Sequence, residues 1–164
     1  MDSLYNKNTT CCFTGHRNIP ASHARKLEAG LENTITGLLK YGINTFISGG
    51  ALGFDMMAAK AVLMAKEKHP EVQLIMALPC RDQHARWCQK DKKEYEALLR
   101  IADDIYYLSD KYITGCMHLR NRFMVEQSGF CISYFTGKSG GTAHTINFAK
   151  DHGLKIINLP HYEI

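Results

Sequence analysis

The chain has 164 residues, of which 45% are hydrophobic and 22% are charged, and its formal net charge at pH 7 is +4. This length suits one domain with a substantial core, and the composition is that of a globular protein rather than a disordered or fibrous one. The charge is too mild and too dispersed for a protein that binds nucleic acid regardless of sequence.

Neither a membrane segment nor a secretion signal can be recognised. No apolar run approaches the ~20 residues that span a bilayer, and residues 1–8 lack the basic and apolar stretches of a signal peptide. The cysteines contain no C-x-x-C pair, and we expect them to be reduced and mostly buried. They are Cys11, Cys12, Cys80, Cys88, Cys116 and Cys131. These features predict a cytoplasmic protein without a membrane partner.

Six short apolar runs alternate with longer stretches of helical periodicity. The predicted strands are residues 10–14, 44–48, 73–78, 104–108, 131–135 and 155–159. The predicted helices are residues 22–41, 55–68, 91–101, 118–127 and 142–151. Because parallel strands need long crossovers and helices supply them, this alternation predicts an α/β fold. We expect a single domain over residues 1–164, with its core at about 10–159, a mostly parallel sheet of about six strands, and helices on both faces.

Three glycine-containing loops follow predicted strands. They are residues 14–17 (TGHR), residues 48–55 (SGGALGFD) and residues 136–142 (TGKSGGT). Ligands of open parallel sheets bind outside the carboxyl ends of the strands, and glycines there let backbone N–H groups approach an anion. We therefore predict a ligand site at this edge of the sheet. Its predicted residues are Thr14, Gly15, His16, Arg17, Ser48, Gly49, Gly50, Gly53, Asp55, Trp87, Arg120, Gly140, Gly141 and Thr142.

Two well-known phosphate motifs do not match these loops. The first loop does not read G-x-G-x-x-G, which argues against the standard dinucleotide motif. Gly137, Lys138 and Ser139 resemble the end of a Walker A loop, but Ile132 stands where that motif needs a glycine. An ATP-hydrolysing P-loop is therefore not expected.

Several side chains near these loops fit an anionic, sugar-bearing ligand. The guanidinium groups of Arg17 and Arg120 suit phosphate oxygens. Asp55 stands at the start of a predicted helix, where it either caps the helix or accepts hydrogen bonds from ribose hydroxyls. Thr142 either caps the last helix or donates to a phosphate. His16 either holds its loop by hydrogen bonding or acts as a general acid or base.

The stretch after the third predicted strand holds the only tryptophan and a candidate metal cluster. Trp87 either belongs to the core or stacks on a base. Cys80, His84 and Cys88 have the i, i+4, i+8 spacing that aligns side chains on one face of a helix, where they would hold a soft metal. A fourth ligand is not evident, and Pro79 indicates that the helix begins only after Cys80, so we expect no metal.

The order of motifs along the chain resembles the YpsA-like branch of the SLOG superfamily. The motifs are TGHR, SGGALGFD, LPCRDQHARW, RNRFMVEQSG and GGT, and the resemblance spans about residues 10–159. It implies a Rossmann-like fold and a nucleotide or nucleotide-derived ligand, such as ADP-ribose or a nucleoside phosphate, in a sensory or regulatory role. No cofactor beyond such a ligand is implied.

A second branch of that superfamily, the cytokinin-activating phosphoribohydrolases, suggests a hydrolase as an alternative. Its M-x-x-R-K motif resembles residues 117–121, which implies ligand contacts for Arg120 and Asn121. Its P-G-G-x-G-T-x-x-E motif resembles residues 140–145 only in part, because the glutamate is missing. Cleavage of an N-glycosidic or phosphoester bond would need another carboxylate, such as Asp55 or Glu126. The candidate catalytic residues are His16, Asp55 and Arg120.

A third branch includes DNA-processing proteins that act on single strands. The chain lacks the run of alternating aromatic and basic residues that stacking on single strands favours. A nucleic-acid or protein partner is therefore less favoured than a small-molecule ligand. The resemblance also implies a possible homodimer, and Tyr106, Tyr107 and Tyr112 supply either an aromatic interface or buried core.

Overall fold

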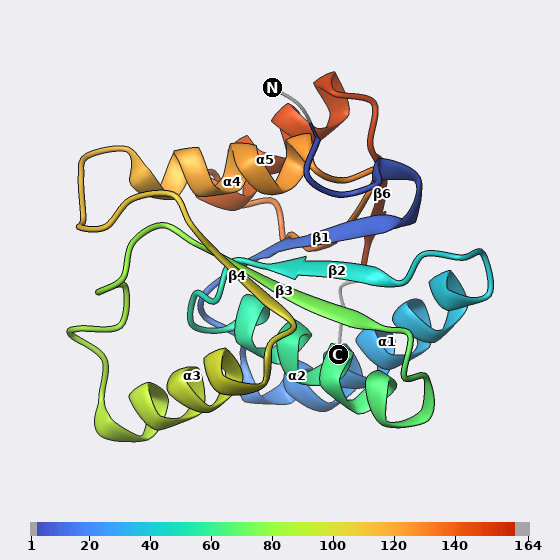
Figure 1. Ribbon diagram of the computed structural model, residues 1–164, viewed down its shortest axis with the longest axis horizontal. Helices are drawn as coiled ribbons and strands as arrows, with labels where there is room; N and C mark the ends of the chain where they lie inside the picture. Colours follow the sequence, from blue (N-terminus) through green and yellow to red (C-terminus); the bar gives the residue numbers. More distant parts are fainter. Residues whose placement is uncertain (1–2, 160–164) are drawn as a thin grey trace.

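The computed structural model describes residues 3–159, in which six strands and five α-helices alternate along the chain (Figure 1). The strands are β1 (Thr10–Gly15), β2 (Thr45–Ser48), β3 (Gln73–Leu78), β4 (Asp104–Tyr107), β5 (Phe130–Tyr134) and β6 (Lys155–Asn158). The helices are α1 (Ala21–Leu39), α2 (Phe54–Lys68), α3 (Gln89–Ile101), α4 (Cys116–Glu126) and α5 (Gly141–Asp151). The predicted α/β class is confirmed, and the predicted element bounds lie within two residues of these. The ends of the predicted domain, residues 1–2 and 160–164, lie outside the described range.

The six strands form one parallel sheet in the order β4-β3-β2-β1-β5-β6. From β1 the chain builds the sheet outward to β4, and α4 then carries it back to β5 on the other side of β1. The strand order therefore reverses between β1 and β5. Loops that leave the carboxyl ends of these two strands turn toward opposite faces, which opens a crevice between them.

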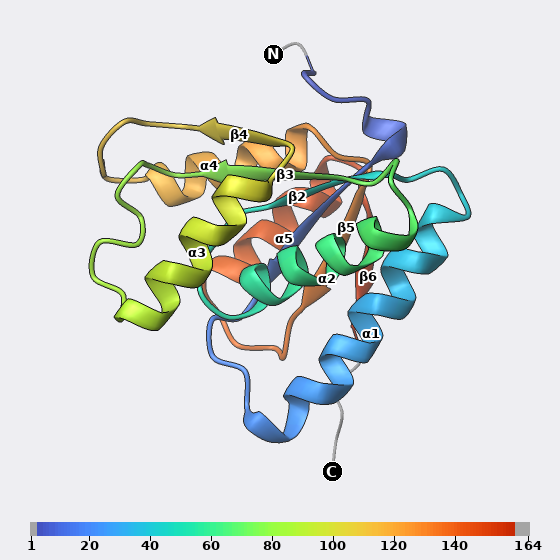
Figure 2. The ribbon, with the colours of Figure 1, turned by 60° about the horizontal axis from the view of Figure 1, so that its bottom comes forward.

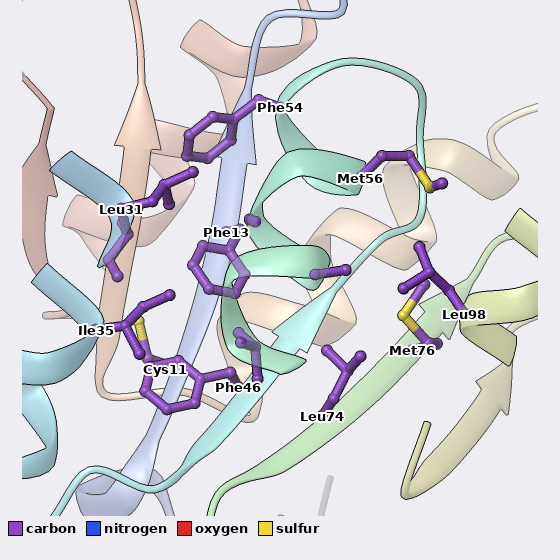
Figure 3. Packing of buried hydrophobic residues seen from close by; sticks show 14 of the residues in the cluster. Cys11, Phe13, Leu31, Ile35, Phe46, Phe54, Met56, Leu74, Met76 and Leu98 are labelled. Carbon is purple, nitrogen blue, oxygen red and sulfur yellow. The ribbon is translucent and has the colours of Figure 1, made fainter. Parts of the chain in front are cut away.

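Helices cover both faces of the sheet. α1, α2 and α3 lie on one face, and α4 and α5 lie on the other (Figures 1 and 2). Side chains alternate along β1, so Cys11 and Phe13 pack toward the first layer and Cys12 packs toward the second. In the first core, Phe13 stacks on Phe46 and meets the edge of Phe54 (Figure 3). Burial on both faces explains why the inner strands β1, β2, β3 and β5 read as largely apolar runs.

The apolar spacing of α1 decides which side of the helix faces the sheet. Leu27, Leu31, Ile35 and Leu38 recur at helical intervals and are all buried. Pro20 precedes the helix, where its missing N–H costs no helical hydrogen bond.

Within residues 3–159, no helix is both long and apolar enough to cross a membrane. All six cysteines have free thiols, and all except Cys88 are buried.

Candidate functional site

A cavity of about 240 Å³, which we call the crevice, lies at the carboxyl edge of the sheet where the strand order reverses. It is bounded by the end of β1, the loop after β2, α4 and the start of α5. The predicted residues that line it are Thr14, Gly15, Arg17, Asp55, Arg120, Asn121, Gly141 and Thr142. Four further residues line it that were not predicted, and these are Phe13, Ala51, Met117 and Met124.

Arg120 reaches the crevice from α4 and is only 5% exposed. Its Nη1 donates to the Gly49 carbonyl and, at 3.5 Å, to Gln83 Oε1. Its Nε donates to Asn121 Oδ1 at 2.8 Å. Among the described residues, Nη2 has only the Met117 sulfur as an acceptor, at 3.7 Å, and a thioether is a weak acceptor. The guanidinium therefore keeps hydrogen-bonding capacity that protein groups do not fill.

Asp55 lies in the first turn of α2 and faces the same crevice, at 7% exposure. Its Oδ2 accepts a hydrogen bond from the Ala51 N–H at 3.4 Å. Burial raises the pKa of Asp55 from 3.8 to about 6, although Arg120 and the Ala51 N–H favour the ionised form. Burial also lowers the pKa of Arg120, against the attraction of Asp55. The crevice thus holds two charged groups that have lost most of their contact with water. The polar groups of a ligand would replace part of that lost hydration.

The helix-capping interpretations of Asp55 and Thr142 are both wrong. α2 has Gly53 at its N-cap position and α5 has Gly140, and neither helix has a side-chain cap hydrogen bond. The first N–H groups of any helix lack acceptors within the helix. Because Gly141 and Thr142 open α5 and line the crevice, the N-terminal end of this helix faces the cavity.

Gly49 explains how Asp55 and Arg120 come close together. A Cβ at Gly49 would lie 2.6 Å from Arg120 Nη1 and 2.8 Å from Asp55 Oδ2. Both distances are too short for non-bonded atoms, so only glycine leaves room for the two charged groups. Gly53 has a φ of +88°, and a Cβ there would lie 2.0 Å from the Arg17 carbonyl oxygen. The loops after β1 and β2 therefore touch through their backbones, and this contact fixes the start of the Arg17 side chain.

The other predicted residues of the loop after β2 shape the crevice rather than line it. Ser48 Oγ donates to the Asp55 carbonyl at 2.9 Å and accepts from the Gly50 N–H at 3.2 Å. Gly50 is buried and packs against Tyr95 and residues of β3. Gly53 lines a separate groove between α1 and α2. Within this loop, the crevice is lined by Ala51 and Asp55.

His16 lies beside the crevice and ties two loops together. Its Nε2 accepts a hydrogen bond from the Thr136 N–H at 2.9 Å and lies 3.0 Å from Thr136 Oγ1. Its ring packs against Tyr134 and Phe135. The imidazole thus joins the loop after β1 to the loop after β5, in agreement with a loop-holding role, and it lines a separate cavity of about 330 Å³.

The stretch between β3 and α3 does not form the helix that a metal cluster would need. Residues 81–86 form turns, so Cys80, His84 and Cys88 are not aligned on one helical face. The His84 ring stacks on Tyr95 at 4.5 Å between centroids. Among residues 3–159 there is no group of three His, Cys, Asp or Glu side chains that could hold a metal ion. Trp87 packs edge-on against Tyr95 at 5.0 Å and lines a different cavity from the crevice.

Comparison with known proteins agrees with this architecture. The chain is 35% identical over 137 residues to the uncharacterized SPbeta prophage-derived protein YoqJ of Bacillus subtilis (strain 168), a match that covers 76% of this chain and 78% of that protein. The fold resembles DNA processing protein A (DprA) from Streptococcus pneumoniae, with a TM-score of 0.67 and 19% identity over 94% of this chain and 51% of that one.

A second solved structure has the same fold. It is DprA from Helicobacter pylori, in a structure that concerns the single-stranded DNA binding mode of that protein, with a TM-score of 0.67 and 21% identity. The likeness covers 94% of this chain and 66% of that one, so this chain spans about half to two thirds of the length of the two DprA chains. The family model described as the YspA SLOG family matches residues 11–156. The chain therefore belongs to the YspA SLOG family.

Proposed function

We propose that the protein binds a nucleotide or nucleotide-derived ligand, such as ADP-ribose or a nucleoside phosphate, in the crevice and serves a sensory or regulatory role in the cytoplasm. The observation that carries this proposal is the convergence of Arg17, Arg120, Asp55 and the start of α5 where the strand order reverses. Ligands of open parallel sheets bind at this point. Membership of the SLOG family supports the ligand class, and six free thiols suit a reducing compartment.

Each group in the crevice suits one part of such a ligand. The first N–H groups of α5, at Gly141 and Thr142, suit a phosphate, because the N-terminal end of a helix dipole favours negative charge. The exposed guanidinium of Arg17 suits phosphate oxygens as a two-pronged donor. The carboxylate of Asp55 suits ribose hydroxyls, which would donate hydrogen bonds to it.

A thermal-shift screen with nucleoside phosphates, NAD and ADP-ribose at about 1 mM tests the proposal. A ligand present at about 100 times its dissociation constant adds about 2.7 kcal/mol of stability. For a domain of this size, that gain raises the melting temperature by about 5 to 10 °C. If none of these compounds raises the melting temperature, the proposal is wrong.

Arg17 offers a variant that separates binding from folding. Replacing Arg17→Ala should weaken ligand binding about 10- to 100-fold, the usual effect of losing a charged hydrogen bond of about 1.5–3 kcal/mol. The melting temperature without ligand should not change, because the side chain is exposed. Arg100→Ala removes the same charge from the far end of α3 and should leave binding unchanged.

Hydrolysis of the bound ligand is a second candidate function, favoured by the position and pKa of Asp55. A carboxyl group with a pKa of about 6 suits proton transfer near neutral pH. Incubation with nucleoside monophosphates or NAD should then release free base, and Asp55→Asn should abolish the release. Stable binding without any free base would leave the protein as a binder only.

Single-stranded nucleic acid is a third candidate, favoured by the likeness to DprA of Helicobacter pylori and the binding mode that its structure concerns. Phosphate contacts release counterions, so oligonucleotide affinity should fall steeply between 50 and 200 mM salt, as is usual for such contacts. Oligonucleotides that fail to bind at about 50 mM salt, under conditions where a mononucleotide binds, would exclude this candidate.

A further inference from the structure

Asp55 and Arg120 are neighbours in the crevice, but they do not pair with each other. Asp55 Oδ2 and Arg120 Nη1 both lie within 2.8 Å of one point, the Cβ position that a side chain at Gly49 would take. Within residues 3–159, the two charged side chains nevertheless share neither a hydrogen bond nor an ion pair. Opposite charges attract each other strongly where water is excluded. Other contacts therefore hold the two groups apart.

Arg120 is held by hydrogen bonds to other acceptors. Its Nη1 donates to the Gly49 carbonyl and, over the long distance of 3.5 Å, to Gln83 Oε1. Its Nε donates to Asn121 Oδ1 at 2.8 Å. Because Asn121 is the next residue on α4, this bond does not attach the guanidinium to another part of the fold. The attachment to other elements runs through Gly49 and Gln83.

Gln83 contacts both the guanidinium and the carbonyl that the guanidinium binds. Its Nε2 donates to the Gly49 carbonyl at 3.3 Å and to the Tyr95 hydroxyl at 3.2 Å. A backbone carbonyl can only accept, so the amide nitrogen faces Gly49 and the amide oxygen is left to face Arg120. One side chain thus fixes two of the groups that decide where Nη1 lies.

Tyr95 anchors the Gln83 side chain to the core. It lies on α3, is fully buried and belongs to the first core. The His84 ring stacks on its ring at 4.5 Å between centroids, and Trp87 packs edge-on against it at 5.0 Å. These contacts restrict the phenol group, so Gln83 reaches Arg120 from a rigid base. Gln83 itself comes from the turns after β3, a part of the chain that was predicted to supply only Trp87 to the site.

The separation leaves both charged groups with bonding capacity for a ligand. Arg120 Nη2 has only the Met117 sulfur as an acceptor, at 3.7 Å, and of the two Asp55 carboxylate oxygens only Oδ2 accepts a hydrogen bond in the part of the chain that the structure describes. A direct ion pair would use this capacity within the protein. A ligand would then have to break a buried pair before it could bind, which is costly.

We propose that Gln83 is a positioning residue that holds Arg120 apart from Asp55 and so keeps both charged groups available to a ligand. The part of this inference that concerns ligand binding rests on the proposed function. The separation of the two charges can be tested without any ligand.

The first test follows the titration of Asp55 in the protein without ligand. Burial raises the pKa of Asp55 to about 6. Gln83→Met removes the polar atoms of the amide at similar side-chain volume, so Arg120 should move onto Asp55, and an adjacent arginine lowers the pKa of an aspartate by about 1–3. The ¹³C NMR signal of the Asp55 carboxyl carbon, assigned with Asp55→Asn, should therefore titrate about one pH unit or more lower. Gln89→Met, at an exposed position in the first turn of α3, should not change this titration.

Two further variants separate a movement of Arg120 from a loss of burial. Water that entered a loosened crevice would also lower the pKa of Asp55, and it would do so with or without Arg120. On an Arg120→Gln background, Gln83→Met should therefore leave the Asp55 titration unchanged. Gln83→Glu keeps an oxygen acceptor for Arg120 and adds a negative charge, so it should not lower the titration midpoint. If Gln83→Met does not fold, Gln83→Asn, which is one methylene too short to reach both partners, replaces it in each comparison.

The second test measures the affinity for ADP-ribose. Gln83→Met should bind ADP-ribose about tenfold or more weakly than the wild type, because the new ion pair has to break first. Gln89→Met should bind it as the wild type does.

The outcomes distinguish this inference from the proposed function. An Asp55 titration that stays unchanged in Gln83→Met, or that falls equally on the Arg120→Gln background, would overturn the inference whether or not ADP-ribose binds. A lower titration midpoint with undiminished affinity for ADP-ribose would show that the separation does not serve binding. Failure of every compound of the thermal-shift screen to bind the wild type would overturn the proposed function, and the titrations would still decide whether Gln83 holds the charges apart.

Discussion

At the scale of single residues, the main feature is the meeting of Asp55 and Arg120 around Gly49. Neither charge is well solvated, because both side chains are more than nine-tenths buried. Burial therefore raises the pKa of Asp55 and lowers the pKa of Arg120, and both shifts favour the neutral form of the group. Such an arrangement costs stability in the unliganded protein, and it is typical of sites that bind polar ligands.

Replacing Asp55→Asn should remove the pH dependence that this buried carboxyl group gives to the stability of the protein. The folded pKa of about 6 lies above the ordinary aspartate value of 3.8, so the stability linked to this proton is present below about pH 4 and is lost as the pH rises through about 6. Asparagine does not titrate. Relative to the wild type, the variant should therefore gain about 2 kcal/mol between pH 4 and pH 8, measured by urea unfolding.

Asp103→Asn supplies a control of opposite sign. Although burial opposes it, hydrogen bonds from Lys66 and from the Leu74 N–H lower the pKa of Asp103. The stability linked to its ionised form is present above about pH 4 and is lost as the pH falls through the folded pKa, so this variant should lose stability relative to the wild type as the pH rises from below 3.8 to about 4. Parallel pH profiles for the Asp55 variant and the wild type would contradict the assigned burial of a charge.

At the scale of elements, the site is made by loops that hold one another. The Phe54 N–H at the start of α2 donates to the His16 carbonyl at 3.2 Å, and Gly53 touches the Arg17 backbone. The His16 ring then accepts from Thr136 in the loop after β5. Three loops far apart in sequence are thus joined directly, and the positions of Arg17 and of the start of α5 depend on those contacts.

Gly53→Ala should disrupt this junction. The new Cβ would lie 2.0 Å from a backbone oxygen at a φ of +88°, so strain and overlap together should cost more than about 3 kcal/mol. Gly37→Ala in α1 is the control, because nothing lies within 4 Å of its Cβ position. That variant should gain about 0.5–1 kcal/mol from helix propensity. Equal melting temperatures for the two variants would show that the loops do not depend on this contact.

At the scale of the whole molecule, β1 is covered by helices on both sides, and its cysteines enter both cores. Cys11 packs toward α1 and α2, whereas Cys12 packs toward α4 and α5 with Cys131. The predicted homodimer interface stays a prediction. Tyr106 stacks on Phe123 at 4.3 Å between ring centroids, and Tyr112 is exposed and lines the same cavity as Trp87.

The distribution of thiols gives a test of the global fold. A thiol reagent should label one cysteine quickly in the native protein, namely Cys88, and all six after denaturation, because the other five are buried. Cys88→Ser should remove the rapid reaction without a change in melting temperature. Rapid labelling of two or more cysteines in the native state would contradict the two-sided core.

The strand and helix pattern could be predicted from the sequence because burial on both faces gives the inner strands β1, β2, β3 and β5 largely apolar runs. Even α1, whose predicted bounds differ by up to two residues from Ala21–Leu39, is recognisable from Leu27, Leu31 and Ile35. The glycine loops and the two arginines were also predicted to share one edge, and the crevice does bring Gly15, Arg17 and Arg120 together with Gly141. The predictions rest on local periodicity and on the general geometry of parallel sheets.

The sequence did not predict which residues of each loop line the crevice and which pack behind it. Gly50 points toward β3 while Ala51 lines the crevice, because the path of the loop after β2 is fixed by the Ser48 and Asp55 hydrogen bonds. Met117 could have been predicted as a lining residue, because it lies one helical turn before Arg120 and shares its face of α4. The sequence by itself determined the fold and the edge that carries the site. Only the tertiary structure decided which side chains face the cavity, because that depends on contacts between loops far apart in the chain.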